Sequence, residues 1–257
     1  MSAQPVTSGR ATPAAPLARV VLAQARAELA MTLGQSERVL VTVIMPVLLL
    51  VLFGQLIPVP SIAGKPINFL LPGILSVAII SSGMVSLGIG TAYERYYGVL
   101  KRLGASPLPR WGLLAAKLIS VLAFEVLQAA LLIGIAALVY GWRPSGALWS
   151  ALPIALLGTA AFVGLGMLMA GALRAEATLA AANGLFVVFL AIGGAVVPVD
   201  HLPGPVAWLA ALLPPAALSD ALRGALSSQS MHAQSIVSLV AWAIVLPVAA
   251  ALTFKWE

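Results

Sequence analysis

Cysteine is absent from the 257-residue sequence, and charged residues are scarce at 9%. The absence of cysteine excludes disulfides, thiolate metal ligands and thiol nucleophiles. A soluble domain carries about 25% charged residues, so this chain has too few charges to cover a surface that faces water. Because 61% of its residues are hydrophobic and its mean hydropathy is +1.05, we predict an integral membrane protein that is embedded in a lipid bilayer.

Six segments are apolar over about the 20 residues that a helix needs to cross a bilayer. The runs are continuous rather than alternating, and an open sheet leaves backbone groups unpaired in lipid, so we predict an all-α polytopic membrane protein. One transmembrane domain, 16–257, is expected to follow a disordered cytoplasmic tail, 1–15, which has no apolar signal segment. The predicted spans cover about 39–57, 69–90, 112–140, 148–173, 178–199 and 233–254.

The formal net charge is +6, and the basic residues gather on one side of the predicted spans. With the N-terminus inside, eleven of the 14 Lys and Arg residues are cytoplasmic, and only Lys65, Arg143 and Arg223 lie outside. The positive-inside rule therefore predicts that both termini are cytoplasmic. No basic stripe is interleaved with aromatic residues, which argues against a nucleic-acid partner.

The segment 16–34 is hydrophobic without fitting a span. Arg19, Arg26 and Glu28 lie off its apolar stripe, so we predict an amphipathic helix along the inner interface, with a cytoplasmic extension of the first span as the alternative. The stripe repeats every fourth position and consists of Leu17, Val21, Ala25, Leu29 and Leu33.

A second such segment, 201–226, precedes the last span. Four prolines divide it into pieces too short to cross the bilayer. We predict an outer re-entrant hairpin of two short helices that meet at Pro214 and Pro215, with Trp208 at the interface. Its charged residues are Asp220 and Arg223.

The loop 91–111, between the second and third spans, concentrates the charges of the chain. A short helix at about 93–103 would carry a small apolar face of Tyr96, Leu100 and Leu103 between cations, and would end at Gly104. A rigid, charged projection on two long helices can transmit a push into the membrane. The alternative is a basic loop that only anchors the topology.

The order Glu94-Arg95-x-x-Gly98-x-Leu100-x-x-Leu103-x-x-Ser106-Pro107 in this loop resembles the signature of permeases in the type 2 ABC exporter family. The six spans, the amphipathic N-terminal helix and the broken outer hairpin extend the resemblance over nearly the whole chain. It assigns ATPase coupling to Glu94, Arg95, Gly98, Leu100, Lys101, Arg102, Leu103, Ser106 and Pro107.

The resemblance implies a bacterial plasma-membrane permease whose loop docks on a separate ABC ATPase subunit. That subunit would bind the ATP and Mg, and the permease would pair with a second copy or a similar chain. Tyr96 and Lys101 stand where family members often carry acids. The more basic loop resembles the branch that exports drug-like or lipid-like cargo.

The chain has no recognisable nucleotide or metal site of its own. Its only Gly-Lys pair, Gly64-Lys65, follows no Gly-rich loop, and His201 and His232 are isolated. We therefore predict a permease without enzymatic activity and without a bound cofactor. An ion-coupled secondary transporter is the alternative, but it is expected to carry paired intramembrane charges or sequence repeats.

Among the polar residues of the predicted spans, Glu125, Gln128 and Asn183 are candidates for a cargo path. Glu125 and Gln128 share a face of the third span, where an ionisable group costs several kcal/mol unless it is paired or hydrated. They could line a cargo path between two permeases, or they could hold neighbouring helices together. Asn183 is more typical of a hydrogen bond between helices than of a ligand site.

Overall fold

The computed structural model describes residues 16–34, 36–56, 65–104, 109–146, 148–227 and 230–254. In these ranges the regular structure is helical, and no strand is present. The predicted tail 1–15 and the loop residues Ser106 and Pro107 lie outside the described residues.

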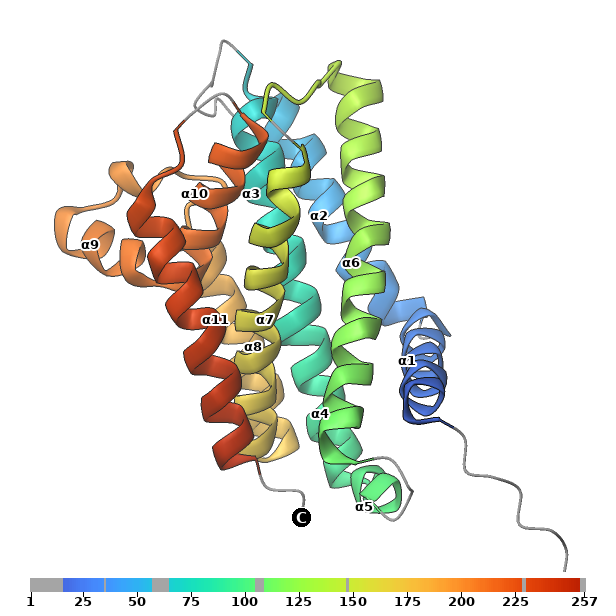
Figure 1. Cartoon of the computed structure of the whole chain (residues 1–257). Coiled ribbons are helices and arrows are strands. Elements are labelled where there is room, and N and C mark those ends of the chain that lie inside the picture. The colour runs from blue at the N-terminus through green and yellow to red at the C-terminus, as the bar shows by residue number, and fades with distance from the viewer. Residues whose placement is uncertain are drawn as a thin grey trace, which may run out of the picture.

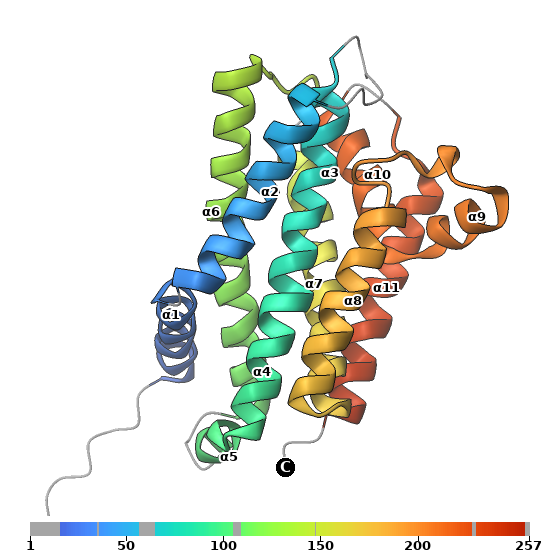
Figure 2. The ribbon, with the colours of Figure 1, turned by 180° about the vertical axis from the view of Figure 1, so that it is seen from behind.

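Long apolar helices run side by side through the molecule (Figures 1 and 2). In the described ranges, five are long and apolar enough to cross a membrane, and a sixth helix, α2, contains the shorter apolar stretch Thr42–Gln55. The predicted all-α polytopic membrane fold is thereby confirmed. The five long helices are the continuous rod of α3 (Ile67–Ile80), η1 (Ser81–Ser86) and α4 (Leu87–Tyr96), then α6 (Arg110–Tyr140), α7 (Leu148–Ala172), α8 (Ala175–Ile192) and α11 (Ala233–Thr253), and the shorter apolar stretch lies in α2 (Ser36–Leu56).

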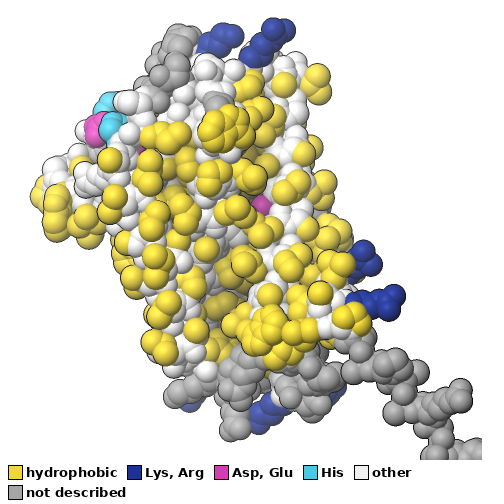
Figure 3. Space-filling model, viewed as in Figure 1, with side chains coloured by type: hydrophobic (Ala, Val, Ile, Leu, Met, Phe, Trp, Pro, Cys, Tyr) yellow, Lys and Arg dark blue, Asp and Glu magenta, His cyan; other side chains and the backbone are white. Residues whose placement is uncertain are grey.

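The surface agrees with this assignment. On the face that Figure 3 shows, hydrophobic side chains cover the middle of the molecule, whereas Lys and Arg side chains lie towards its two ends. The end that carries α1 and α5 is called the inner end below, and the opposite end is called the outer end.

The rod α3–η1–α4 forms the centre of the bundle. Every residue from Phe69 to Ile80 is buried, because α2, α6, α7 and α10 all pack against α3. Close packing on α7 depends on small residues. A Cβ atom at Gly88 would lie 3.0 Å from the Cα of Gly166, so this pair lets the two backbones touch. The turn η1 is a π-helix, which is rare and is often found at functional sites.

Helix α1 (Leu17–Gly34) lies beside α6 at the flank of the bundle near its inner end, and both opposite views look almost along its axis, so it makes a wide angle with the spans (Figures 1 and 2). Val21 and Ala25 are buried with Leu113 of α6, as the apolar stripe predicts. This confirms a separate N-terminal helix with a buried apolar side, and its position at the inner membrane interface stays a prediction. Glu28 was expected to lie off the stripe, but it is buried and points towards α6.

The outer hairpin consists of α9 (Gly204–Leu212) and α10 (Pro214–Leu226), which meet at an angle of 78°. The break falls at Leu213, whose extended backbone is what a following proline favours. Helix α9 stands away from the bundle with Trp208 exposed, whereas α10 packs among α3, α7 and α11 (Figure 1). A 3₁₀ turn, η2 (Val199–His201), precedes the pair.

Arg223 was predicted as an outer loop cation, but its side chain is buried within the outer half of the bundle. Its guanidinium donates hydrogen bonds to the carbonyl oxygens of Gly194 and Ala195 and lies 3.9 Å from the ring centroid of Phe69. These contacts fasten the turn after α8 to α10 and α3. Asp220, on the same helix, accepts a hydrogen bond of 2.7 Å from Ser235 at the start of α11.

Candidate functional site

The loop between α4 and α6 contains two helical pieces rather than the predicted single helix. Helix α4 ends at Tyr96, and α5 (Val99–Gly104) begins three residues later. Gly98 separates them with a φ of +70°, a left-handed conformation that costs other residues about 1–2 kcal/mol. The expectation of one helix at 93–103 was wrong because this glycine turns the chain.

Five exposed side chains form what we call the α4–α5 surface. The rings of Tyr96 and Tyr97 pack edge to face with their centroids 5.1 Å apart, although both side chains are about two-thirds exposed (64% and 65%). Val99, Lys101 and Arg102 of the following helix α5 are also exposed. The surface consists of Tyr96, Tyr97, Val99, Lys101 and Arg102.

Leu100 was expected to supply an exposed apolar contact for an ATPase, and the structure corrects this. Its side chain is 1% exposed and belongs to the cluster with Val21 of α1 and Leu113 of α6. Leu100 therefore anchors α5 on the neighbouring helices. The placement of the Leu103 side chain is not among the described features.

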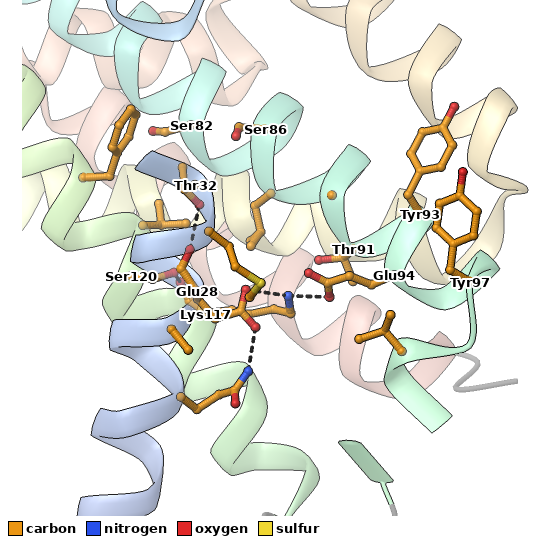
Figure 4. Close-up of a pocket in the computed structure, with 18 residues that line it drawn as sticks. Glu28, Thr32, Ser82, Ser86, Thr91, Tyr93, Glu94, Tyr97, Lys117 and Ser120 are labelled. Atoms are coloured by element: carbon orange, nitrogen blue, oxygen red, sulfur yellow. Dashed lines mark hydrogen bonds and ion pairs between the residues drawn. The ribbon is translucent and has the colours of Figure 1, made fainter. Parts of the chain in front are cut away.

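Behind the α4–α5 surface lies a buried cluster of three charges. Lys117 of α6 donates hydrogen bonds to Glu94 of α4 at 2.7 Å and to Glu28 of α1 at 3.2 Å (Figure 4). Gln24 donates a further hydrogen bond to the other oxygen of Glu28. Glu94 was expected to face the ATPase or to cap the start of a helix. Instead it lies near the end of α4 and pairs inwards.

This cluster ties three helices together. Lys117 is only 2% exposed, and a buried ammonium costs several kcal/mol unless carboxylates surround it. The two glutamates compensate for this cost only when α1, α4 and α6 keep their relative positions. The cluster therefore fixes α1, α4 and α6 relative to one another.

Arg95 makes a comparable connection to the other side of the bundle. Its guanidinium donates to the carbonyl oxygen of Gly171 at 2.6 Å and to that of Leu173. These carbonyls belong to the end of α7, where backbone acceptors have no partner within the helix. Arg95 thus joins α4 to the turn between α7 and α8.

Two cavities open beside these connections. One has a volume of about 660 Å³ and lies between α1, the η1–α4 segment and α6, with the three charged residues in its wall. The other, of about 520 Å³, lies between α6, α7 and α11 and has mostly apolar walls that include Trp111 and Phe254.

Glu125 lies deeper in the bundle, on α6, and is 9% exposed. Its two carboxyl oxygens lie 2.9 Å from Ser82 Oγ of η1 and 2.5 Å from Thr159 Oγ1 of α7. Gln128 donates to the carbonyl oxygen of Thr42 on α2 at 2.8 Å. Both residues therefore connect helices inside one protomer. Asn183 does not, because its side chain is exposed on α8.

The model of the ABC-2 type transporter family matches residues 19–227, more than four-fifths of the sequence. The chain belongs to the ABC-2 type transporter family. A comparison with curated proteins finds no match. The matched residues extend from α1 to the end of α10 and include the α4–α5 surface and the buried charge cluster.

Membership makes the chain a multi-pass permease subunit of an ABC transporter, a class that works with ABC ATPase partners. The resemblance noted in the sequence is confirmed at this level. The residue-by-residue coupling roles remain predictions. The residues predicted to couple to the ATPase fall into two groups in the structure. Lys101 and Arg102 are exposed, whereas Glu94, Arg95 and Leu100 make contacts that fix the loop in place.

Sequence reasoning missed the role of Lys117, which is one of the eleven Lys and Arg residues that the sequence assigns to the cytoplasm. One signal was present, since Lys117 lies inside the predicted span 112–140, where a cation needs a partner. The partner residues Glu28 and Glu94 are 89 and 23 positions away in the sequence. No local pattern identifies such a pairing.

We expect Glu125→Leu to assemble and transport nearly as the parent does. Ser82 and Thr159 also lie 2.9 Å from backbone carbonyls of their own helices, so both hydroxyls keep an acceptor when the carboxyl is removed. Replacing a buried polar network by an apolar side chain of similar size is often neutral. The measurements are thermal unfolding and transport in proteoliposomes. A stable Glu125→Leu protein without transport would assign Glu125 to the cargo path.

Proposed function

We propose that this permease belongs to an ATP-driven exporter, and that a separate ATPase subunit docks on the α4–α5 surface. The observation that supports it best is the combination of exposed Tyr and Arg side chains with buried connections to three helices. Tyr and Arg are enriched where protein interfaces gain most of their binding energy. The buried connections let a docked partner move the bundle.

The path of that movement follows the rod α3–η1–α4. The α4–α5 surface stands at the inner end of the rod, and α3 packs against α10 of the outer hairpin. Displacement of the surface is therefore passed to the outer half of the molecule as well as sideways through Lys117 and Arg95. The ATPase would bind ATP and Mg, and this chain would convert the hydrolysis cycle into helix movement.

We propose a hydrophobic or amphipathic cargo, drug-like or lipid-like. The side chains exposed on the spans are mainly aliphatic, such as Val187 on α8 and Val237 on α11. Such surfaces offer dispersion contacts and few hydrogen bonds, which suits apolar molecules better than sugar polymers.

We propose that two permeases, identical or similar, pair within a bacterial plasma membrane, with both termini in the cytoplasm. Asn183 supports the pairing, because an exposed amide on a span is costly in lipid and gains a partner at a helix–helix contact. Exposed cations support the orientation. Arg19, Arg26, Lys101 and Arg102 stand at the inner end, against Lys65 and Arg143 at the outer end.

Inverted membrane vesicles that contain the permease and its ATPase test this function. We expect ATP added outside these vesicles to drive uptake of a fluorescent lipophilic dye. In the same vesicles, a single cysteine at Arg26, which is exposed on α1 outside the docking surface, should react with an impermeant maleimide, whereas one at Ser145 should not. The chain has no native cysteine, so the labelling is specific. Dye uptake driven by an ion gradient without ATP would instead favour a secondary transporter.

A further inference from the structure

We propose that the 660 Å³ cavity between α1, the η1–α4 segment and α6 binds an amphipathic organic cation, with an ammonium group at its charged end. Tyr97 and Val99 of the α4–α5 surface also line this cavity, but the inference rests on the charged and unpartnered groups of the cavity wall and not on the proposed coupling. A volume of this size is within the range of about 300–1,000 Å³ that is typical of small-molecule sites.

The charge of the cavity wall determines whether a cation or an anion can bind. Among the described residues that line it, only Glu28, Glu94 and Lys117 carry charge, so two carboxylates face one ammonium. One negative charge remains in excess in surroundings of low dielectric constant, where charge interactions are strong. A cation compensates this excess, whereas an anion increases it.

A buried hydroxyl without a partner indicates where the ligand is held. Thr91 lines the cavity and is 1% exposed, and its Oγ1 has no hydrogen-bond partner in the part of the chain that the structure describes. Helical threonines commonly donate to a carbonyl of the preceding turn, as Thr159 and Thr178 do here. Thr91 lies one helical turn before Glu94, beside the same wall of the cavity (Figure 4). An ammonium N–H placed there can donate to both.

The rest of the wall suits the apolar part of the ligand. Met31 of α1, Leu87 of α4 and Val121 and Phe124 of α6 supply an apolar part of the cavity wall. The cavity lies beside α1 at the inner end of the spans, a level that amphipathic cations reach when they are attracted to anionic lipids. The site therefore combines a polar end, at Thr91 and Glu94, with an apolar end.

Equilibrium binding of monodansylcadaverine, a primary ammonium on an apolar fluorophore, tests the proposal. The full-length chain in lipid nanodiscs should give saturable binding, read from the rise in dansyl fluorescence. The N-acetylated probe, which has the same shape without the charge, should bind at least about tenfold more weakly, because a charged hydrogen bond is lost. Equal saturable binding of both probes would overturn the assignment of a cation site.

Two variants locate the site. Thr91→Val removes only the unpartnered hydroxyl and should weaken probe binding about tenfold. Glu94→Gln removes the excess charge and should weaken it at least as much. Glu176→Gln, a carboxylate change at the exposed start of α8, is the matched control and should leave binding unchanged.

If Glu94→Gln does not purify as a folded protein, Thr91→Val decides the question, because the fold loses no hydrogen bond in that variant. Binding by Thr91→Val that equals binding by the parent chain would place the probe in the bilayer or at another site, and would overturn the proposal.

Discussion

Replacing Lys117 with methionine should destabilise the permease by about 3–5 kcal/mol, because Glu28 then stays buried, and Glu94 part-buried, without their cation. Glu28 and Lys117 are 9% and 2% exposed, so water cannot replace the lost partner. The variant should unfold at a markedly lower temperature in the same detergent, and α1 should become accessible to protease. The stability is lost mainly at the contact between α1 and α6, because the ion pair of Lys117 with Glu28 joins these two helices.

A triple variant separates the charge effect from packing. Lys117→Met combined with Glu28→Gln and Glu94→Gln leaves no buried charge in the cluster, and we expect it to regain most of the lost stability. Lys101→Met removes a cation from the exposed side of α5 and should change the unfolding temperature little. A Lys117→Met protein as stable as the parent would show that the cluster does not hold the helices together.

Local sequence patterns were enough to predict the architecture. The apolar stripe of α1 appears at helical spacing, and Val21 and Ala25 are buried as that spacing requires. Pro214 marks the bend in the outer hairpin because proline restricts the residue before it. These features depend on residues that are close together in the sequence, so a pattern of a few residues is enough to predict them.

The arrangement of the inner end could not be predicted in the same way. The pairing of Lys117 with Glu28 joins residues 89 positions apart, and its existence depends on how α1 crosses the bundle. Leu100 has the helical spacing of an exposed contact residue, but α1 and α6 cover it. Arg95 is of a residue type that is common at docking surfaces, yet its guanidinium is bound by carbonyl oxygens at the end of α7. In each case tertiary contacts decide between two roles that look identical in the sequence.

This distinction changes which variants test ATPase docking. Glu94→Lys would place a second cation beside Lys117 and damage the bundle, so a loss of transport would not identify a docking surface. Substituting Gly98 would strain a left-handed turn. Side chains that are exposed and make no contribution to the core are better choices, and the α4–α5 surface supplies Tyr96, Tyr97, Lys101 and Arg102.

Replacing these four residues with alanine should reduce ATP-driven transport more than about thirtyfold, because truncation of Tyr and Arg contacts often costs about 2 kcal/mol or more each. The quadruple variant should keep the unfolding temperature of the parent, since the side chains are exposed. It should no longer co-purify with the ATPase. The measurements are transport in proteoliposomes and the ratio of ATPase to permease after purification.

The matched control is Arg19→Ala with Arg26→Ala, which removes two exposed cations from α1 at the same end of the molecule. If only the general attraction of basic residues held the ATPase, both variants would weaken binding alike and high salt would abolish it. If the α4–α5 surface is a specific contact, the α1 variant should retain transport. Full transport by the quadruple variant would mean that the loop only anchors the topology, and that the connections through Lys117 and Arg95 stabilise the bundle without transmitting a push.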